Sequence, residues 1–308
     1  MELSILTICY LIGSLTFIIG LKMLSHPESA RKGNMVAAVG MFIAIFGTIF
    51  LYQENGVGLH NYGWIFGALV LGTVVGTLAA KRVKMTAMPE LVSLFNGMGG
   101  ACAALISVIE FGHIAALYSG EHPDQAAPTE GTLLTIFLGL IIGAVSFAGS
   151  IIAWGKLEGR ISSKPWSFKG LQYLNLGVFI LITLLGVLFC SQVAIDGVIL
   201  IGIMFILSCF LGVSLVMAIG GGDMPVVVSM LNSYSGWAAS AAGFMLGNDL
   251  LIVTGALVGS SGAILSIHMC EAMNRSFFSV IFASGSSTQQ SGERTAIDGE
   301  VTAIEHDN

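Results

Sequence analysis

Two short motifs carry the polar residues of this chain that are best placed to act in an apolar environment. Asn96 and Asn232 each follow a Met-Pro pair at the same spacing, and Ser93 and Ser229 each come three residues before their asparagine. An asparagine side chain cannot carry a proton near neutral pH, but its amide offers two donors and an acceptor. It can therefore hold a water molecule in a proton path, or it can join neighbouring helices by a hydrogen bond. The residues alone favour neither role over the other.

Histidine, the usual proton carrier near neutral pH, is rare within the apolar stretches. Only His268 lies inside one of them, near its end, where it could titrate or could simply lie at the membrane interface. The other histidines are expected in solvated loops, at span ends or in the tail, and they are His26, His60, His113, His122 and His306.

Motifs of nucleotide, metal and hydrolytic chemistry are missing from the sequence. It contains no Walker A motif, no H-E-x-x-H site and no G-x-S-x-G nucleophile elbow. The glycine groups Gly97–Gly100 and Gly220–Gly222 do not follow a strand, so neither is a dinucleotide fingerprint. The 5 cysteines show no ligand spacing, and the basic residues form no patch suited to nucleic acid. We therefore expect no metal, nucleotide or nucleic acid on this chain, which leaves transport or coupling.

The apolar stretches themselves set the fold class. The 308 residues are 55% hydrophobic and only 10% charged, with 40 glycines. A soluble domain could not stay dispersed with this composition, whereas about 20 apolar residues suffice to cross a bilayer as a helix. We predict an all-α membrane protein, a bundle of about nine transmembrane helices. The predicted spans are 4–22, 35–52, 62–80, 88–108, 132–155, 171–190, 195–218, 224–246 and 250–270.

The charges assign an orientation to these spans. When successive loops alternate between the two sides, all 12 Lys and Arg residues, Lys156 among them, fall on one side. Because basic loops stay in the cytoplasm, the N-terminus is predicted outside and the C-terminus in the cytoplasm. The opposite loops carry only acidic charges, which are Glu54, Glu110, Glu121, Asp124, Glu130, Asp196 and Asp249.

The two asparagine motifs belong to an internal repeat. Residues 88–96 match residues 224–232 in their Met, Pro, Ser and Asn positions, and Gly100 matches Gly236. The prolines fit the first turn of a helix, where a missing N–H costs nothing. Both asparagines then lie roughly 12 Å into their helices, at matching depth, on a narrow stripe with serine and glycine. Since both helices run outward from the cytoplasm, the predicted repeat is parallel.

Acidic residues mark the cytoplasmic starts of the two repeated helices. Asp223 comes directly before the second copy, where it is placed to cap the helix. Glu90 lies in the first turn of the first copy, where the helix dipole favours a carboxylate. Simple capping is the alternative to a functional role for both residues.

The span at 250–270 is rich in small or weakly polar residues, which favours tight packing or a helix able to slide or turn. At its cytoplasmic end Glu271 and Arg275 have i, i+4 spacing, so Arg275 could be an interfacial anchor or a hinge. The small residues are Gly255, Gly259, Ser260, Ser261, Gly262 and Ser266. Further G-x-x-x-G pairs predict close helix packing elsewhere. They are Gly63 and Gly67, Gly72 and Gly76, and Gly139 and Gly143.

The composition changes abruptly after the last span, to a Ser-, Gly- and Gln-rich segment with an acidic end. We therefore divide the chain into a transmembrane domain at 1–282 and a flexible linker at 283–308. By composition alone the linker is either a disordered tail or a tether to a domain that is absent from this chain.

Several strings of the sequence resemble one protein family. The similarity is to the beta subunit of proton-translocating NAD(P) transhydrogenase, it runs from residue 20 to residue 282, and it is most specific in the second half. The strings that carry it are Met85–Val92, Ile161–Pro165, Asp223–Trp237, Gly247–Ala263 and Ala272–Ser276.

The resemblance implies a role in a larger complex. In that family a hydride passes from NADH to NADP+ while protons flow into the cytoplasm. The alpha subunit binds NAD(H), and a Rossmann-like domain that follows the beta membrane helices binds NADP(H). The linker at 283–308 is then the tether to that NADP-binding domain. The resemblance further implies a dimer of complete protomers in the bacterial inner membrane.

The family motifs also imply roles for single residues. Asn232 matches a channel residue, Asp223 the cytoplasmic contact with the nucleotide domain, and Arg275 a hinge. The stripe implicated in coupling matches Ser260, Ser261, Gly262 and Ser266.

Asn96 departs from the family, because some members have a histidine there that is treated as the membrane proton carrier. The titrating group must then lie elsewhere, on a partner's membrane helix, which we favour, or at His268. We expect water held by Asn96 and Asn232 to relay the proton. A stand-alone secondary transporter or channel and a structural membrane anchor are the alternatives. The absence of charge from the predicted helix interiors counts against an ion transporter.

Overall fold

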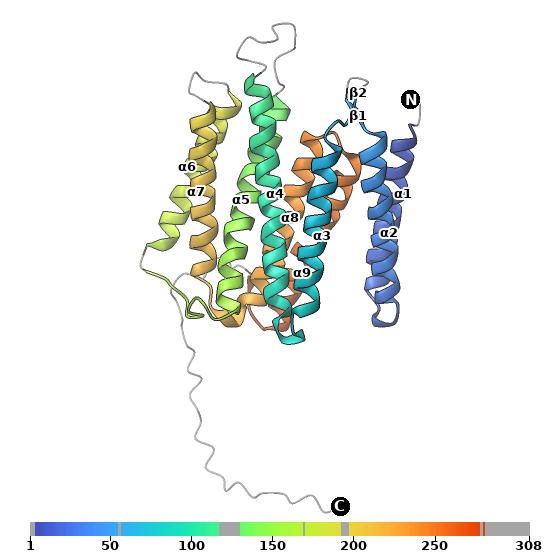
Figure 1. Ribbon diagram of the computed structural model, residues 1–308. Helices are drawn as coiled ribbons and strands as arrows, with labels where there is room; N and C mark the ends of the chain where they lie inside the picture. Colours follow the sequence, from blue (N-terminus) through green and yellow to red (C-terminus); the bar gives the residue numbers. More distant parts are fainter. Residues whose placement is uncertain are drawn as a thin grey trace, which may run out of the picture.

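The computed structural model describes residues 4–54, 57–116, 130–168, 170–191, 197–277 and 280. Over these ranges the chain is the predicted all-α bundle (Figure 1). Two 3-10 turns, η1 (Met85–Ala87) and η3 (Gly221–Asp223), lead directly into α4 and α8. The helices are α1 (Ile5–Leu24), α2 (Pro27–Leu51), α3 (Tyr62–Arg82), α4 (Met88–Ala116), α5 (Glu130–Leu157), α6 (Leu171–Cys190), α7 (Gly197–Met217), α8 (Met224–Met245) and α9 (Asp249–Ala272).

Each predicted span overlaps one of these helices along most of its length. The largest differences are at two ends, since α2 begins at Pro27, ahead of the predicted residue 35, and α4 ends at Ala116, beyond the predicted residue 108. Pro27 occupies the first turn of α2, and Glu28 beside it complements the helix dipole. Hydropathy marks only the apolar part of a helix, so these polar extensions were assigned to loops.

A short β-hairpin connects α2 and α3. Strand β1 (Gln53–Glu54) pairs antiparallel with β2 (Val57–Gly58), with Gln53 opposite Gly58. Within the described ranges the β-structure is confined to these two-residue strands, so the all-α class is confirmed.

Eight of the described helices are long and apolar enough to cross a membrane, as judged from their length and composition. The helix α8 is not among them, because it carries Asn232 and several serines. Its position explains this difference, since 13 of its 22 residues are buried by other helices. The outer helices instead expose many apolar side chains, such as Trp64 at 84%, as contact with lipid requires.

Three pairs of consecutive helices pack along much of their length, namely α1 with α2, α4 with α5, and α8 with α9. The helix α8 also packs against α4 and α5, so these helices form the centre of the bundle. The helices α6 and α7 lie at one side and α1 and α2 at the other (Figure 1). One buried apolar cluster joins Leu231 of α8 to Ala153 of α5 and Val216 of α7.

Matching contacts recur at the two predicted copies, and they involve pairs of helices. A Cβ added to Gly100 of α4 would lie 2.8 Å from the Gly143 carbonyl oxygen of α5, and one added to Gly236 of α8 would lie 2.9 Å from the Gly255 carbonyl oxygen of α9. Both contacts are closer than a Cβ tolerates, so glycine is required at each. The pair α8 and α9 therefore repeats the close approach of α4 and α5, although α5 and α9 share little sequence.

Hydrogen bonds between the paired helices repeat as well. Ser93 Oγ donates to the Ser150 carbonyl oxygen at 3.0 Å, and Ser229 Oγ donates to the Gly262 carbonyl oxygen at 3.1 Å. Both serines are buried. The predicted serine stripe thus faces the neighbouring helix in each copy.

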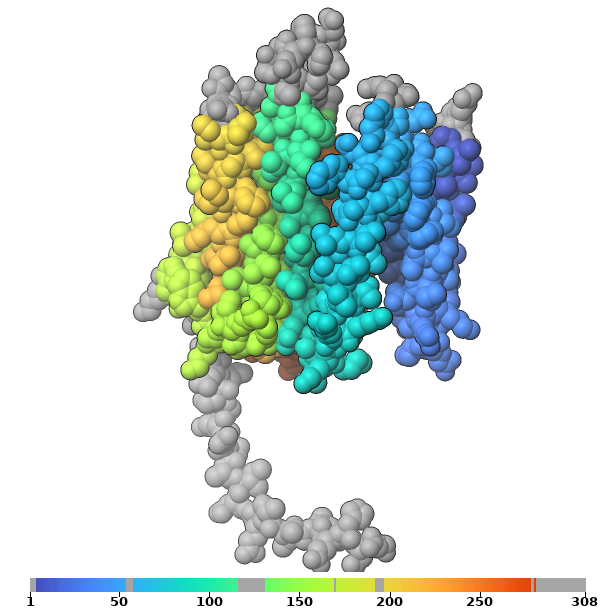
Figure 2. Space-filling model, viewed as in Figure 1, coloured from blue at the N-terminus to red at the C-terminus, as the bar shows by residue number. Residues whose placement is uncertain are grey.

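The glycine pairs of α3 do not pack as predicted. A Cβ added to Gly63, Gly67, Gly72 or Gly76 would meet nothing within 4 Å, and no residue of α3 is buried. The prediction of close packing is therefore wrong for α3 within the described chain, whereas Gly139 and Gly143 of α5 do approach neighbouring helices. Figure 2 shows α3 standing on the surface, between α4 and the α1–α2 hairpin.

Candidate functional site

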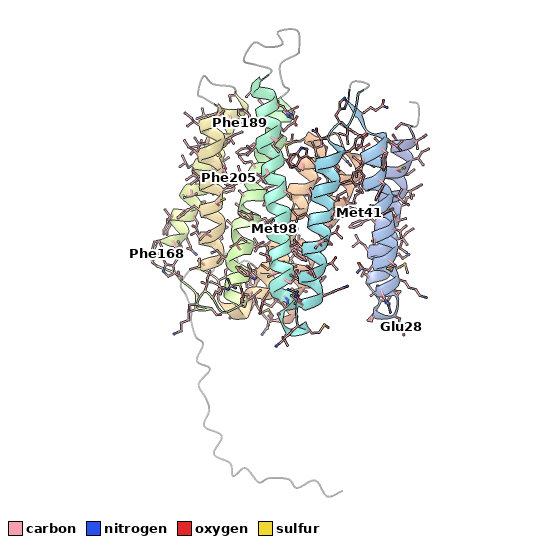
Figure 3. The ribbon with its side chains drawn as sticks, in the orientation of Figure 1. Glu28, Met41, Met98, Phe168, Phe189 and Phe205 are labelled. Atoms are coloured by element: carbon pink, nitrogen blue, oxygen red, sulfur yellow. The ribbon has the colours of Figure 1, made fainter. Side chains whose placement is uncertain are left out.

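Asn96 lies at a polar cluster where α4, α5 and α8 meet. Its side-chain Nδ2 donates to Ser150 Oγ at 2.9 Å and reaches Ser146 Oγ at 3.5 Å. Asn96 lies eight residues, or roughly 12 Å, beyond the start of α4 at Met88, and Met98 two residues further along is labelled in Figure 3. A side-chain amide at this depth is retained only when protein or water satisfies it, and here α5 supplies the partners.

Ser146 connects the cluster to α8. Its Oγ donates to the Leu231 carbonyl oxygen at 3.0 Å and lies 2.6 Å from Ser235 Oγ. Ser235 Oγ in turn donates to the Asn96 carbonyl oxygen at 3.2 Å. Only the Ser146 and Ser235 hydroxyls can exchange donor and acceptor roles, because Asn96 Nδ2 only donates and the backbone carbonyl oxygens only accept. The cluster can therefore orient a water molecule, but none of its groups can store a proton.

Asn232 lies outside this cluster. It is half-buried on α8, and among the described residues its side-chain amide has no hydrogen-bond partner. The α8 residue that does reach Asn96 is Ser235. The two amides have equivalent places in their helices, but the structure does not bring them together.

The N-terminal start of α8 is tied to the segment after α9. Asp223 Oδ2 and Arg275 Nη1 are 3.5 Å apart, and only 14% of the Asp223 side chain is exposed. Asp223 is the N-cap residue of α8, but its side chain makes no capping hydrogen bond. The prediction that its carboxylate caps α8 is therefore wrong, because that carboxylate pairs with Arg275 instead.

The end of α9 differs from the prediction that paired Glu271 with Arg275. The helix stops at Ala272, and Asn274 adopts a left-handed backbone with φ of 52°, so Arg275 no longer follows the helical repeat. Glu271 pairs instead with His268, at 3.2 Å from Nδ1 to Oε2. His268 is exposed and lies in the last two turns of α9, which ends at Ala272.

The small residues of α9 divide between two faces. Gly262 and Ser266 are buried against α8, and a Cβ added to Gly262 would lie 2.9 Å from the Ser233 backbone nitrogen. Ser260 and Ser261 are exposed. Half of the predicted coupling stripe is therefore buried within the chain, and the other half lies on the surface of α9.

Glu90 is half-buried in the first turn of α4, as the sequence predicted. The structure adds Ser146, Ser150 and Ser235, which the sequence analysis did not single out. Their signal is weak, because a serine in an apolar helix often bonds its own backbone carbonyl and then carries no functional meaning.

Comparison with known proteins decides the family. The model of the NAD(P) transhydrogenase beta subunit family matches residues 6–308. The chain belongs to this family. Two proteins named NAD(P) transhydrogenase subunit beta, one from Rhodospirillum rubrum and one from a named strain of that species, are each 44% identical to it over 278 residues. The matched residues are 90% of this chain but 58% of each relative, so the chain spans just over half the length of the beta subunits it matches.

The transhydrogenase family implies nicotinamide nucleotides, and the described part of this chain does not fit one. Its helices include no β-α-β unit on which a dinucleotide could lie. The same ranges gather no group of three or more His, Cys, Asp or Glu side chains suited to a metal ion. What these residues offer is hydrogen bonding, in the Asn96 cluster, and charge pairing, between Asp223 and Arg275.

Proposed function

We propose that this chain is the membrane part of a proton-translocating NAD(P) transhydrogenase in the bacterial inner membrane. It couples proton flow into the cytoplasm to hydride transfer from NADH to NADP+ on partner domains. The observation that carries this proposal is the ring of hydrogen bonds joining Asn96, Ser146 and Ser235 between α4, α5 and α8, to which Ser150 adds a further bond from Asn96. Such a ring is costly in a bilayer unless it has a function or a firm structural role.

The proton route needs a group that titrates, which Asn96 cannot supply. We place that group on a membrane helix of the alpha subunit, with His268 as the alternative within this chain. Asn96 and the serines then orient water on one side of α8, and Asn232 does so on another. The Ser93 and Ser229 hydroxyls hold the paired helices that carry the two amides.

The gate lies at the cytoplasmic start of α8. A rigid helix transmits a shift of Asp223 to Ser235, which lies 12 residues and roughly 18 Å further along. The nucleotide domain reaches this gate through Asp223, Arg275 and Glu90, and the faces of α9 adjust with it. The segment 283–308 lies outside the described residues, and we propose that it is the tether to the NADP-binding domain. The complete complex is a dimer of protomers.

The proposal is tested by substituting each amide in the complex reassembled with an alpha subunit and an NADP-binding domain. Asn96→Leu and Asn232→Leu are expected to lower proton-coupled hydride transfer by roughly tenfold. Asn96 loses its bonds to serines of α5 and Asn232 loses a group that can bind water, and each such loss costs about 1–2 kcal/mol. Uncoupled exchange of hydride between bound nucleotides stays near its original rate. Proton movement is measured with a pH-sensitive dye in vesicles.

The matched control is Asn175→Leu, which removes another intramembrane amide. Asn175 accepts a hydrogen bond from Ser214 Oγ at 2.6 Å between α6 and α7, away from the proposed route. Full coupling in both Asn96→Leu and Asn232→Leu would reject the relay. Failure of the chain to bring down an alpha subunit on purification would favour a stand-alone transporter.

A further inference from the structure

Lys156, near the end of α5, is a buried cation without a carboxylate partner. Its side chain is among the largest fully buried ones, with 2% of the residue exposed. Its ammonium donates to three backbone carbonyl oxygens, those of Val216 at 3.1 Å, Met217 at 2.8 Å and Ile219 at 2.8 Å. Within the described ranges no acidic group lies within ion-pair distance of it. The sequence analysis had assigned this lysine to a solvated loop.

These carbonyls belong to the end of α7 and to the turn that follows it. The last carbonyls of a helix lack partners within the helix and carry the negative end of its dipole. An ammonium has three protons, and all three find acceptors here, so a buried charge that would otherwise be costly is satisfied. Lys156 therefore caps α7 from a different helix.

The chain directly after α5 holds the same turn from its other side. The Gly221 backbone nitrogen donates to the Ser163 carbonyl oxygen at 2.9 Å, and the Trp166 backbone nitrogen donates to the Met217 carbonyl oxygen at 3.0 Å. A Cβ added to Gly221 would lie 2.8 Å from Ser163 Cβ, so only glycine fits. The α7–α8 turn, residues 218–223, is thus held between Lys156 and the 161–166 segment.

The turn leads directly to Asp223, which ends η3 and precedes α8. The same helix that holds the turn, α5, carries Ser146 and Ser150 of the Asn96 cluster one and a half to three turns earlier. The position of α5 is therefore fixed against the turn at one point and against Asn96 at another.

We propose that Lys156 is a positioning residue for coupling, which sets where the α7–α8 turn presents Asp223 and links that position to the Asn96 cluster through α5. This inference rests on the proposed function, because it assigns a new part to the same proton route. We assign Lys156 this positioning role because its three donor bonds all go to backbone carbonyl oxygens of the end of α7 and the turn after it.

The first test measures coupling in the reassembled complex with Lys156→Met, which keeps the length of the side chain and removes its charge and donors. We expect the ratio of protons moved to hydrides transferred to fall by about tenfold, while uncoupled nucleotide exchange and the yield of complex stay unchanged. The conservative variant Lys156→Arg is expected to restore part of the ratio. The matched control Lys164→Met removes an exposed lysine that lines one pocket together with Lys156 and Gly221, and it should leave the ratio unchanged.

The second test measures the mobility of the α7–α8 turn itself. A structural defect elsewhere in the chain would not change this mobility. Gly222 has open space where a Cβ would lie, so Gly222→Cys can carry a nitroxide label in a Cys102→Ala background. With Lys156 present, we expect a restrained spectrum that changes when NADP+ binds to the complex. With Lys156→Met, we expect a mobile spectrum that no longer responds to NADP+.

The outcomes separate this inference from the proposed function. A full proton ratio and an unchanged label spectrum in Lys156→Met would overturn the role of Lys156, even if Asn232→Leu uncouples the complex. If Lys156→Met does not assemble, Lys156→Gln keeps a donor without charge and is measured in the same way, and wild-type values in it likewise overturn the inference. Full coupling in both asparagine variants would instead reject the proposed route.

Discussion

Ser146 joins three helices through one hydroxyl, so it is the position where a small change tests the Asn96 cluster directly. Its hydroxyl reaches Leu231, Ser235 and Asn96 at once. Ser146→Ala removes only the oxygen and leaves the packing of α5 in place. We expect the free energy of unfolding to fall by about 1–2 kcal/mol, because the Ser235 and Asn96 groups lose a buried partner. Coupled transport falls with it.

The control for this prediction is Ser208→Ala in α7. Ser208 is equally buried, but its Oγ donates to the Met204 carbonyl oxygen of its own helix at 2.7 Å. Thermal unfolding of the purified complex and dye-monitored proton movement are measured for both variants. Equal behaviour of the two variants would show that the cluster is ordinary helix packing.

Single residues also mark the limit of what the sequence could reveal. The asparagines were found because an amide is unusual in an apolar span, and their depth followed from the helix rise. Their partners were not found, since hydropathy says nothing about which helices meet. Lys156 was assigned to a loop because hydropathy cannot show that backbone carbonyl oxygens of another helix accept its hydrogen bonds. Every residue has such an oxygen, so no sequence pattern marks these acceptors.

At the scale of elements, the paired helices α4–α5 and α8–α9 are held by glycines at matching positions. Gly236→Ala would push a methyl group to 2.9 Å from the Gly255 carbonyl oxygen, and Gly100→Ala would do the same to Gly143 at 2.8 Å. Neither backbone can yield without separating the helices. We expect each variant to lower the free energy of unfolding by about 1–3 kcal/mol, by the cost of overpacking.

The matched control is Gly202→Ala in α7, where a Cβ would meet nothing within 4 Å. It should leave the midpoint of thermal unfolding unchanged or raise it slightly, because alanine is the better helix former. If Gly236→Ala and Gly202→Ala unfold at the same temperature, α8 and α9 are not in close contact in the assembled complex.

The elements were the most predictable part of this fold. Every predicted span holds one helix, because apolar length is imposed by the bilayer. The repeat was visible at α4 and α8, where Pro, Ser and Asn recur, but not at α5 and α9, where mainly the small residues at the contacts correspond. The packing of α3 was predicted wrongly, because a G-x-x-x-G pair indicates a face able to approach a helix and does not say whether that helix belongs to the same chain.

At the scale of the whole molecule, the orientation in the membrane determines whether the proposed gate faces the nucleotide domains. The distribution of the basic residues predicts that the proposed gate lies in the cytoplasm. The two ends of α3 offer a direct test, since His60 before the helix and Lys84 after it are both exposed and no residue of α3 is buried. Its 21 residues span roughly 32 Å, enough to separate the two ends across the hydrocarbon core.

We expect His60→Cys to react with a membrane-impermeant maleimide only from the outside, and Lys84→Cys only from the cytoplasmic side, in right-side-out and inverted vesicles respectively. The exposed Cys102 is replaced by Ala in both variants. The reverse pattern would put Asp223, Arg275 and the end of α9 outside the cell, where no cytoplasmic nucleotide domain could reach them. Because one helix carries both labels, a single experiment decides the side of the gate, and with it whether the tether at 283–308 can lead to a domain that binds NADP(H).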